Sequence, residues 1–208
     1  MSVYNPNRYN WITKLIQYLV IYFLFVPCYY VLFRIKIYGK ENIPKDKKPF
    51  VVMPNHIANL DPPLVSVALK MPVAYMAKEE LYSVPVINWF ITIMGAFSVK
   101  REKVEKTTII ATKEILKKGW AVGLFLEGTR SKNKGELGKP FVGPAYVSNL
   151  NNVPILPVGI TGTDKLFGNV VVKIGKPFFP DKDLEKAKWQ CAEKLCELTG
   201  FKMPSQLN

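Results

Sequence analysis

The chain has 208 residues, of which 29 are Lys or Arg and 16 are Asp or Glu, so its formal net charge at pH 7 is +13. Hydrophobic residues make up 49% of the chain, which excludes a disordered protein and suits one domain with a sizeable core. The excess of positive charge indicates an anionic partner: phosphate, nucleic acid or an acidic lipid surface.

The first long feature is an apolar stretch over residues 11–33, in which Lys14 is the only charged residue. It is too long and too aromatic for a secretory signal, and its length fits one membrane-spanning helix. Pro27 interrupts it, however, and both flanks are basic, so the positive-inside rule gives no orientation. Its Trp and Tyr content suits a membrane interface. We therefore predict a pair of helices bent near Pro27 and embedded in one leaflet; a full span and a buried core helix are the alternatives.

Beyond this stretch, short apolar runs rich in β-branched residues alternate with helical patterns. The predicted strands are residues 34–38, 50–53, 73–77, 96–99, 121–126, 155–160 and 170–174. The predicted helices are 61–70, with Asp61 as its N-cap, followed by 86–94, 102–118 and 181–198. The alternation predicts an α/β fold with a mainly parallel sheet flanked by helices. We expect a helical membrane anchor over residues 1–33 and a single α/β domain over residues 34–208.

Few residues are available for cofactor or metal chemistry. His56 is the only histidine, so no site can combine several imidazoles, and we expect neither a metal ion nor a bound cofactor. The sequence lacks the Gly-rich phosphate loop, the dinucleotide-binding fingerprint and the nucleophile elbow of serine hydrolases. The three cysteines, Cys28, Cys191 and Cys196, are too few for a disulfide framework and favour a reducing compartment.

His56 follows the predicted strand 50–53, and Asp61 lies five residues further on. A carboxylate beside one imidazole nitrogen fixes the tautomer, and the other nitrogen can then take a proton from a hydroxyl. Each residue also has a plainer interpretation: Asp61 as a helix cap, His56 as a surface loop residue and Asn55 as a turn residue. The spacing alone leaves both interpretations open.

Basic residues follow three further predicted strands: Lys78, Arg101 and Arg130. In the segment 127–130 (EGTR), a glycine lets backbone amides approach an anion, and an arginine offers two donors to a phosphate. Each Lys or Arg taken alone could simply lie on a solvated surface. If the strands are parallel, their carboxyl ends meet at one edge of the sheet, and all these side chains gather there with His56.

These motifs resemble the four ordered sequence blocks of the glycerolipid acyltransferases, which include the 1-acyl-glycerol-3-phosphate acyltransferases. The blocks are Asn55-His56-x-x-x-x-Asp61, then 95–101 (GAFSVKR), 125–131 (FLEGTRS) and 153–158 (VPILPV), and the lead-in 38–44 is similar too. A single His-x4-Asp pattern is a weak signal, whereas four blocks in order with suitable gaps are a specific one. The likeness extends over about residues 37–175.

The resemblance implies a role for each block. His56 would be the general base and Asp61 its orienting partner, while Pro157 would shape the final block. The acceptor-phosphate block would consist of Glu127, Gly128, Thr129 and Arg130, with added charge from Arg101 and Lys78. One departure concerns the basic residue that members usually carry before a helix-opening glycine. Val142 stands near that place here, so the basic role falls to Lys139 or is absent, which bears on acceptor specificity.

The reaction implied is acyl transfer from acyl-ACP or acyl-CoA to the free hydroxyl of 1-acyl-sn-glycerol 3-phosphate, giving phosphatidic acid without an acyl-enzyme. The anchor would hold the protein monotopically on the cytoplasmic face of the cell membrane, against anionic lipid. The alternatives are acylation of glycerol 3-phosphate or another lysolipid, and a non-catalytic membrane-surface protein that binds anionic lipid. We expect no nucleic-acid partner, because no recognised motif for one is present.

Overall fold

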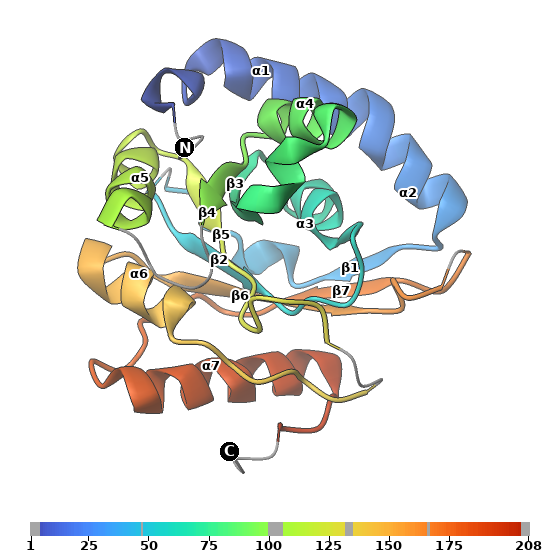
Figure 1. Cartoon of the computed structure of the whole chain (residues 1–208). Helices are drawn as coiled ribbons and strands as arrows, with labels where there is room; N and C mark the ends of the chain where they lie inside the picture. Colours follow the sequence, from blue (N-terminus) through green and yellow to red (C-terminus); the bar gives the residue numbers. More distant parts are fainter. Residues whose placement is uncertain (1–4, 47, 100–105, 132–134, 166, 205–208) are drawn as a thin grey trace.

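The computed structural model describes residues 5–46, 48–99, 106–131, 135–165 and 167–204. Within them, one seven-stranded sheet forms the centre of the fold, with helices on both faces (Figure 1). Its strands are β1 (Lys36–Tyr38), β2 (Val51–Pro54), β3 (Val73–Lys78), β4 (Phe97–Val99), β5 (Ala121–Gly123), β6 (Ile155–Thr161) and β7 (Val171–Ile174). Each overlaps a strand predicted from the sequence, so the predicted α/β class is confirmed.

The strand order is β1-β7-β6-β2-β5-β3-β4. Strands β6, β2, β5, β3 and β4 are mutually parallel, whereas β7 runs antiparallel to β6, and β1 pairs with β7 in parallel. The connection from β6 to β7, residues 162–170, is too short for the crossover that parallel neighbours need. The sheet is therefore mainly parallel, as predicted, and its reversed strands lie at the edge remote from β5, β3 and β4.

The helices cover the two faces of the sheet unequally. Helices α1 (Trp11–Val20), α2 (Val26–Leu32), α3 (Asp61–Leu69) and α4 (Pro85–Ile93) lie on one side, and α5 (Lys106–Lys117), α6 (Gly143–Asn151) and α7 (Leu184–Thr199) belong to the other (Figure 1). Alternate β2 residues serve the two layers: Val52 packs toward α3, and Val51 and Met53 pack toward α5 and α7. Each face of the sheet is thus buried under helices.

Helix α6 was not among the helices predicted from the sequence pattern. Its nine residues include Gly, Pro, Ser and Asn, which are weak helix formers. Pro144 stands in its first turn, where a missing backbone N–H costs nothing, and Asn152 ends it with a positive φ of 51°. Burial of Ala145 and Val147 against the sheet layer stabilises this short helix.

The N-terminal apolar stretch forms one helix over Trp11–Leu32, long and apolar enough by length and composition to cross a membrane. The sequence predicted a pair of helices bent near Pro27. In the structure α1 and α2 follow one another without a break through a π-turn over Ile21–Phe25. In this turn the Val26 N–H bonds to the Ile21 carbonyl, five residues back. The wider turn accommodates the Pro27 ring, which would otherwise clash with a carbonyl of the preceding turn.

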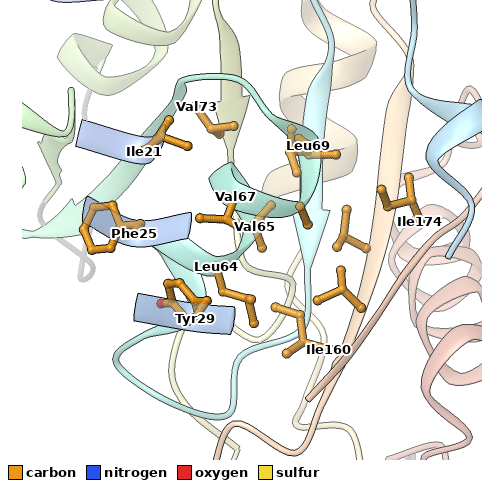
Figure 2. Close-up of a cluster of buried hydrophobic side chains, with 14 of the residues drawn as sticks. Ile21, Phe25, Tyr29, Leu64, Val65, Val67, Leu69, Val73, Ile160 and Ile174 are labelled. Carbon is orange, nitrogen blue, oxygen red and sulfur yellow. The ribbon is translucent and has the colours of Figure 1, made fainter. Parts of the chain in front are cut away.

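One face of this helix is part of the protein core. Figure 2 shows Ile21, Phe25 and Tyr29, spaced four residues apart, beside Leu64 and other buried side chains of α3. The Tyr29 hydroxyl also donates a 2.5 Å hydrogen bond to the carbonyl of Leu60, just before α3. Packing and hydrogen bonding therefore continue across residue 33, where the sequence suggested a boundary between anchor and domain.

The opposite face of the helix is apolar and exposed. Trp11, Phe23 and Val31 are each more than 70% exposed, and α4 adds Val86 and Trp89. Large contiguous apolar surfaces are uncommon on soluble monomers and indicate a contact with a membrane or another protein. Contact with a membrane through this face stays a prediction.

Candidate active site

Asp61 lies at the start of α3, where it is completely buried. Its Oδ2 accepts hydrogen bonds from His56 Nδ1 at 2.9 Å and from the backbone N–H groups of Ile57 and Ala58 at 2.6 and 2.7 Å. The N-cap of α3 is Leu60 rather than Asp61, which corrects the predicted cap. The Asp61 carboxylate instead accepts hydrogen bonds from the backbone of the preceding turn and from the His56 ring, and so holds that ring beside it.

The His56 ring is fixed by a second contact. It stacks on Phe125, with ring centroids 4.0 Å apart and 21° between the planes, and Phe125 in turn stacks on Tyr75. Because Oδ2 of Asp61 also accepts two backbone N–H groups, it acts as an acceptor, and Nδ1 of His56 carries the proton. Nε2 has no hydrogen bond to any part of the chain that the structure describes, and the side chain is 16% exposed. This nitrogen is available to act as a base.

The third sequence block holds the backbone of His56 from both sides. The His56 N–H donates to Glu127 Oε2 at 3.1 Å, and the His56 carbonyl accepts from the Ser131 N–H at 2.8 Å. Glu127 is only 2% exposed, and burial raises the pKa of its carboxyl group to about 8. Glu127 was predicted to belong to the acceptor-phosphate block. Its carboxyl group lies in the interior and holds the backbone of His56, and a role toward the acceptor stays a prediction.

The rest of this block is exposed. Gly128 has a φ of +60°, which favours glycine, and its N–H closes a tight turn onto the carbonyl of Phe125. Thr129 and Arg130 follow on the surface. Since Ser131, the next residue, is bonded to His56, the structure brings Arg130 and His56 to the same edge of the sheet.

The other predicted basic residues are described less completely. The backbone of Lys78 ends β3 and pairs with Val99 of β4. Arg101 lies outside the described residues. The strands that precede His56, Lys78, Arg101 and Arg130 are parallel to one another, so the condition for their gathering at one edge is met. Their contact with an acceptor stays a prediction.

Two segments flank the third block. Lys139 is exposed, and Phe141 donates its N–H to the carbonyl of Leu126, so this segment runs beside the block. Val142 is the N-cap of α6, and its apolar side chain cannot hold an anion.

Pro157 of the fourth block lies within β6 and pairs with β2. Among the described residues, no three His, Cys, Asp or Glu side chains come together as metal ligands.

Two polar side chains at this edge have roles that the sequence did not reveal. The buried Asn55 amide bonds to both the N–H and the carbonyl of Ile160, at 2.7 and 2.9 Å, and so ties the end of β2 to β6. Thr163 donates its hydroxyl to Oδ1 of Asp61 at 2.8 Å. Thr163 follows β6, which is parallel to β2. Thr163 follows the end of β6 as His56 follows the end of β2, so its position after a strand was a signal present in the sequence.

A protein-family model described as Acyltransferase matches residues 34–161, which include His56, Asp61 and the segment 127–130. The chain belongs to the acyltransferase family. It is similar to the chloroplastic 1-acyl-sn-glycerol-3-phosphate acyltransferase BAT2 of Brassica napus, with 29% identity over 86% of this chain and 52% of that protein. The Bacillus subtilis 1-acyl-sn-glycerol-3-phosphate acyltransferase is 32% identical over 69% of this chain and 73% of that protein.

The fold of this acyltransferase also has a solved counterpart. The crystal structure of the 1-acyl-sn-glycerophosphate acyltransferase from Thermotoga maritima superposes with a TM-score of 0.66 and 26% identity, covering 89% of this chain and 76% of that one. The chain spans about half the length of the plant relatives that it matches.

Proposed function

We propose that this acyltransferase transfers a fatty acyl group from acyl-ACP or acyl-CoA to the free hydroxyl of 1-acyl-sn-glycerol 3-phosphate, giving phosphatidic acid. The observation that carries the proposal is the 2.9 Å bond between His56 Nδ1 and Asp61, which leaves Nε2 free beside the exposed turn that ends in Arg130. The names of the relatives support this acceptor. The base, His56, and the phosphate-binding group, Arg130, would then act on the same acceptor molecule.

In the proposed reaction, Nε2 of His56 takes the proton of the acceptor hydroxyl as its oxygen attacks the thioester carbonyl carbon. The new C–O bond forms, the C–S bond breaks, and the thiolate leaves with the proton that His56 returns. Asp61 stabilises the imidazolium that exists between these two proton transfers. The thioester is already activated, so a positioned base and a bound acceptor supply much of what is needed.

We assign the acceptor phosphate to the exposed turn of the third block. Arg130 would hold two phosphate oxygens with its planar guanidinium group, and the positive φ of Gly128 opens the backbone for a close approach. Lys78 and Arg101 would add positive charge at neighbouring strand ends. With the phosphate held there, the free hydroxyl of the acceptor reaches the nearby imidazole.

The membrane side of the proposal rests on the exposed apolar face of α1, α2 and α4. Embedded in the cytoplasmic leaflet, this face would let the acceptor reach His56 without leaving the lipid. The net charge of +13 would attract both anionic lipid and an acidic acyl donor, since each Lys or Arg near the surface contributes about 1 kcal/mol.

The first test uses the purified full chain with lysophosphatidate and either acyl-CoA or acyl-ACP, scoring released thiol and phosphatidate. His56→Ala should lower the rate by about 10²–10⁴-fold, which is the range for general acid–base catalysis. Binding to lipid vesicles should not change. Retention of more than about a hundredth of the rate would contradict the role of His56. Glycerol 3-phosphate and lysophosphatidylcholine as alternative acceptors test the substrate assignment.

A second test addresses the phosphate site. Arg130→Ala should raise KM for lysophosphatidate by tenfold or more and leave KM for the thioester nearly unchanged, because the lost hydrogen bonds contact only the acceptor. Arg34→Ala is the matched control, since Arg34 is also exposed but precedes β1 at the remote edge of the sheet. Equal increases in both KM values would show that the phosphate assignment is wrong.

A further inference from the structure

We propose that Thr163 is a positioning residue for catalysis, the third member of a chain that runs Thr163–Asp61–His56. The inference rests on the proposed function of the His56–Asp61 pair, and Thr163 lies beyond the region that the family model matches. Its hydroxyl donates to Asp61 Oδ1 at 2.8 Å, and its side chain is almost completely buried.

The two oxygens of Asp61 have different partners. Oδ2 accepts all three bonds from the turn after β2, including the one from His56, while the hydroxyl of Thr163 binds Oδ1. The carboxylate is fully buried, so an Oδ1 without this donor would lack a partner in the interior. The carboxylate would then be anchored through Oδ2 alone, and rotation about its Cβ–Cγ bond would shift Oδ2 relative to Nδ1. Thr163 therefore fixes the plane of the group that orients the imidazole.

The backbone around Thr163 is built to hold this hydroxyl in place. Gly162 has a φ of +84°, and a Cβ added there would come within 2.3 Å of the carbonyl oxygen of Asn169, so the turn after β6 requires glycine. Just before the turn, Ile160 is bonded through both backbone groups to the side chain of Asn55. The end of β6 is thus fastened to the end of β2, and Thr163 and His56 are fixed to the same two strands.

The kinetic test replaces the hydroxyl and keeps the shape. Thr163→Val should lower kcat about 10- to 100-fold, the usual effect of removing a partner that orients a functional group, with both KM values changing less than threefold. Thr163→Ser, which keeps the hydroxyl, should stay within threefold of the wild-type kcat. Thr161→Val, at the end of β6 and two residues before Thr163, is the control for replacing a nearby threonine and should leave kcat unchanged.

The single histidine provides a second, activity-independent measurement. In full-chain protein labelled with ¹⁵N-histidine, every ring signal belongs to His56. The Nδ1–H resonance should be sharp in the wild type and in Thr163→Ser, and broadened or lost by exchange in Thr163→Val. Thermal unfolding of each variant shows whether the fold is retained. If Thr163→Val does not fold, the test uses kcat of Thr163→Ser and the Nδ1–H signal of Thr163→Ala instead.

The outcomes separate this inference from the proposed function. A Thr163→Val enzyme with wild-type kcat and an unchanged Nδ1–H signal would overturn the positioning role while His56→Ala still abolishes transfer. A Thr163→Ser enzyme as slow as Thr163→Val would also overturn it, because the hydroxyl would then not be the group that matters. If His56→Ala itself retained activity, the base assignment would fail first.

Discussion

The N-terminal helix offers a comparison between two phenylalanines two residues apart. Phe25 is 8% exposed and packs edge-on against Phe90 of α4 with ring centroids 5.8 Å apart, whereas Phe23 is 79% exposed. Both lie in the π-turn of the same helix. The pair therefore separates the two functions of this helix: completing the protein core and presenting an apolar face to the surroundings.

Phe25→Ala should lower the free energy of unfolding by about 3–5 kcal/mol, the usual cost of removing a buried phenylalanine. Since 1 kcal/mol shifts Tm by roughly 2–4 °C in a domain of this size, the midpoint should fall by about 6–20 °C. Phe23→Ala should change stability by less than about 0.5 kcal/mol, because its side chain has few partners to lose. Thermal unfolding of the full chain in a mild detergent measures both values.

Binding to vesicles should show the reverse order. Transfer of an exposed phenylalanine side chain into lipid contributes about 1.5–3 kcal/mol, so Phe23→Ala should weaken partitioning onto anionic vesicles by about 10- to 150-fold. Folded Phe25→Ala protein should bind as the wild type does. Equal stability of the two variants would refute the packing of this helix on α3. Unchanged vesicle binding by Phe23→Ala would refute the membrane contact of its outer face.

Two further predictions concern the turn after β2. The pKa of Glu127, about 8 in the fold, exceeds its ordinary value of 4.5, so the folded state binds the extra proton and wild-type stability falls as pH rises between these values. Glu127→Gln removes this pH dependence. The free energy of unfolding of the variant relative to that of the wild type should therefore rise from pH 5 to pH 8 in urea titrations. A difference that stays constant with pH would contradict the raised pKa of Glu127. Asn55→Ala leaves both backbone groups of Ile160 unpaired and should cost about 1–3 kcal/mol and also lower kcat. Asn59→Ala, in the same turn but exposed, is the control. Equal losses of stability in the two variants would contradict the role of the Asn55–Ile160 hydrogen bonds.

The predictable part of the site depended on where strands end. Each of the strands that lead to His56, Lys78 and Arg130 is short, apolar and followed by polar residues, so both the strands and the polar residues after them were visible in the sequence. Their parallel pairing then made proximity a geometric consequence. Glu127 lies in the same segment as Arg130, but the sequence could not show that Glu127 is buried and Arg130 exposed. The segment is a turn, and side chains in a turn do not alternate in direction with a regular period.

Pro27 shows how tertiary contacts act on a local preference. A proline inside an apolar run ordinarily ends or kinks a helix, and the sequence pattern accordingly predicted a pair of helices bent near Pro27. The helix continues because a π-turn accommodates the ring and because Phe25 and Tyr29, on either side of Pro27, are buried against the rest of the domain. Tertiary packing therefore outweighed a local preference.

The amino-acid sequence by itself determined the order of the strands and of every helix except α6, the single imidazole with its carboxylate, and an apolar N-terminal segment, because all of these follow from local composition and spacing. Only the tertiary structure decided which way β7 runs, which face of the N-terminal helix is buried, and that Thr163 and Asn55 support the His56–Asp61 pair. Those features depend on contacts between residues as many as 105 positions apart, and such contacts leave no periodic pattern in a single chain.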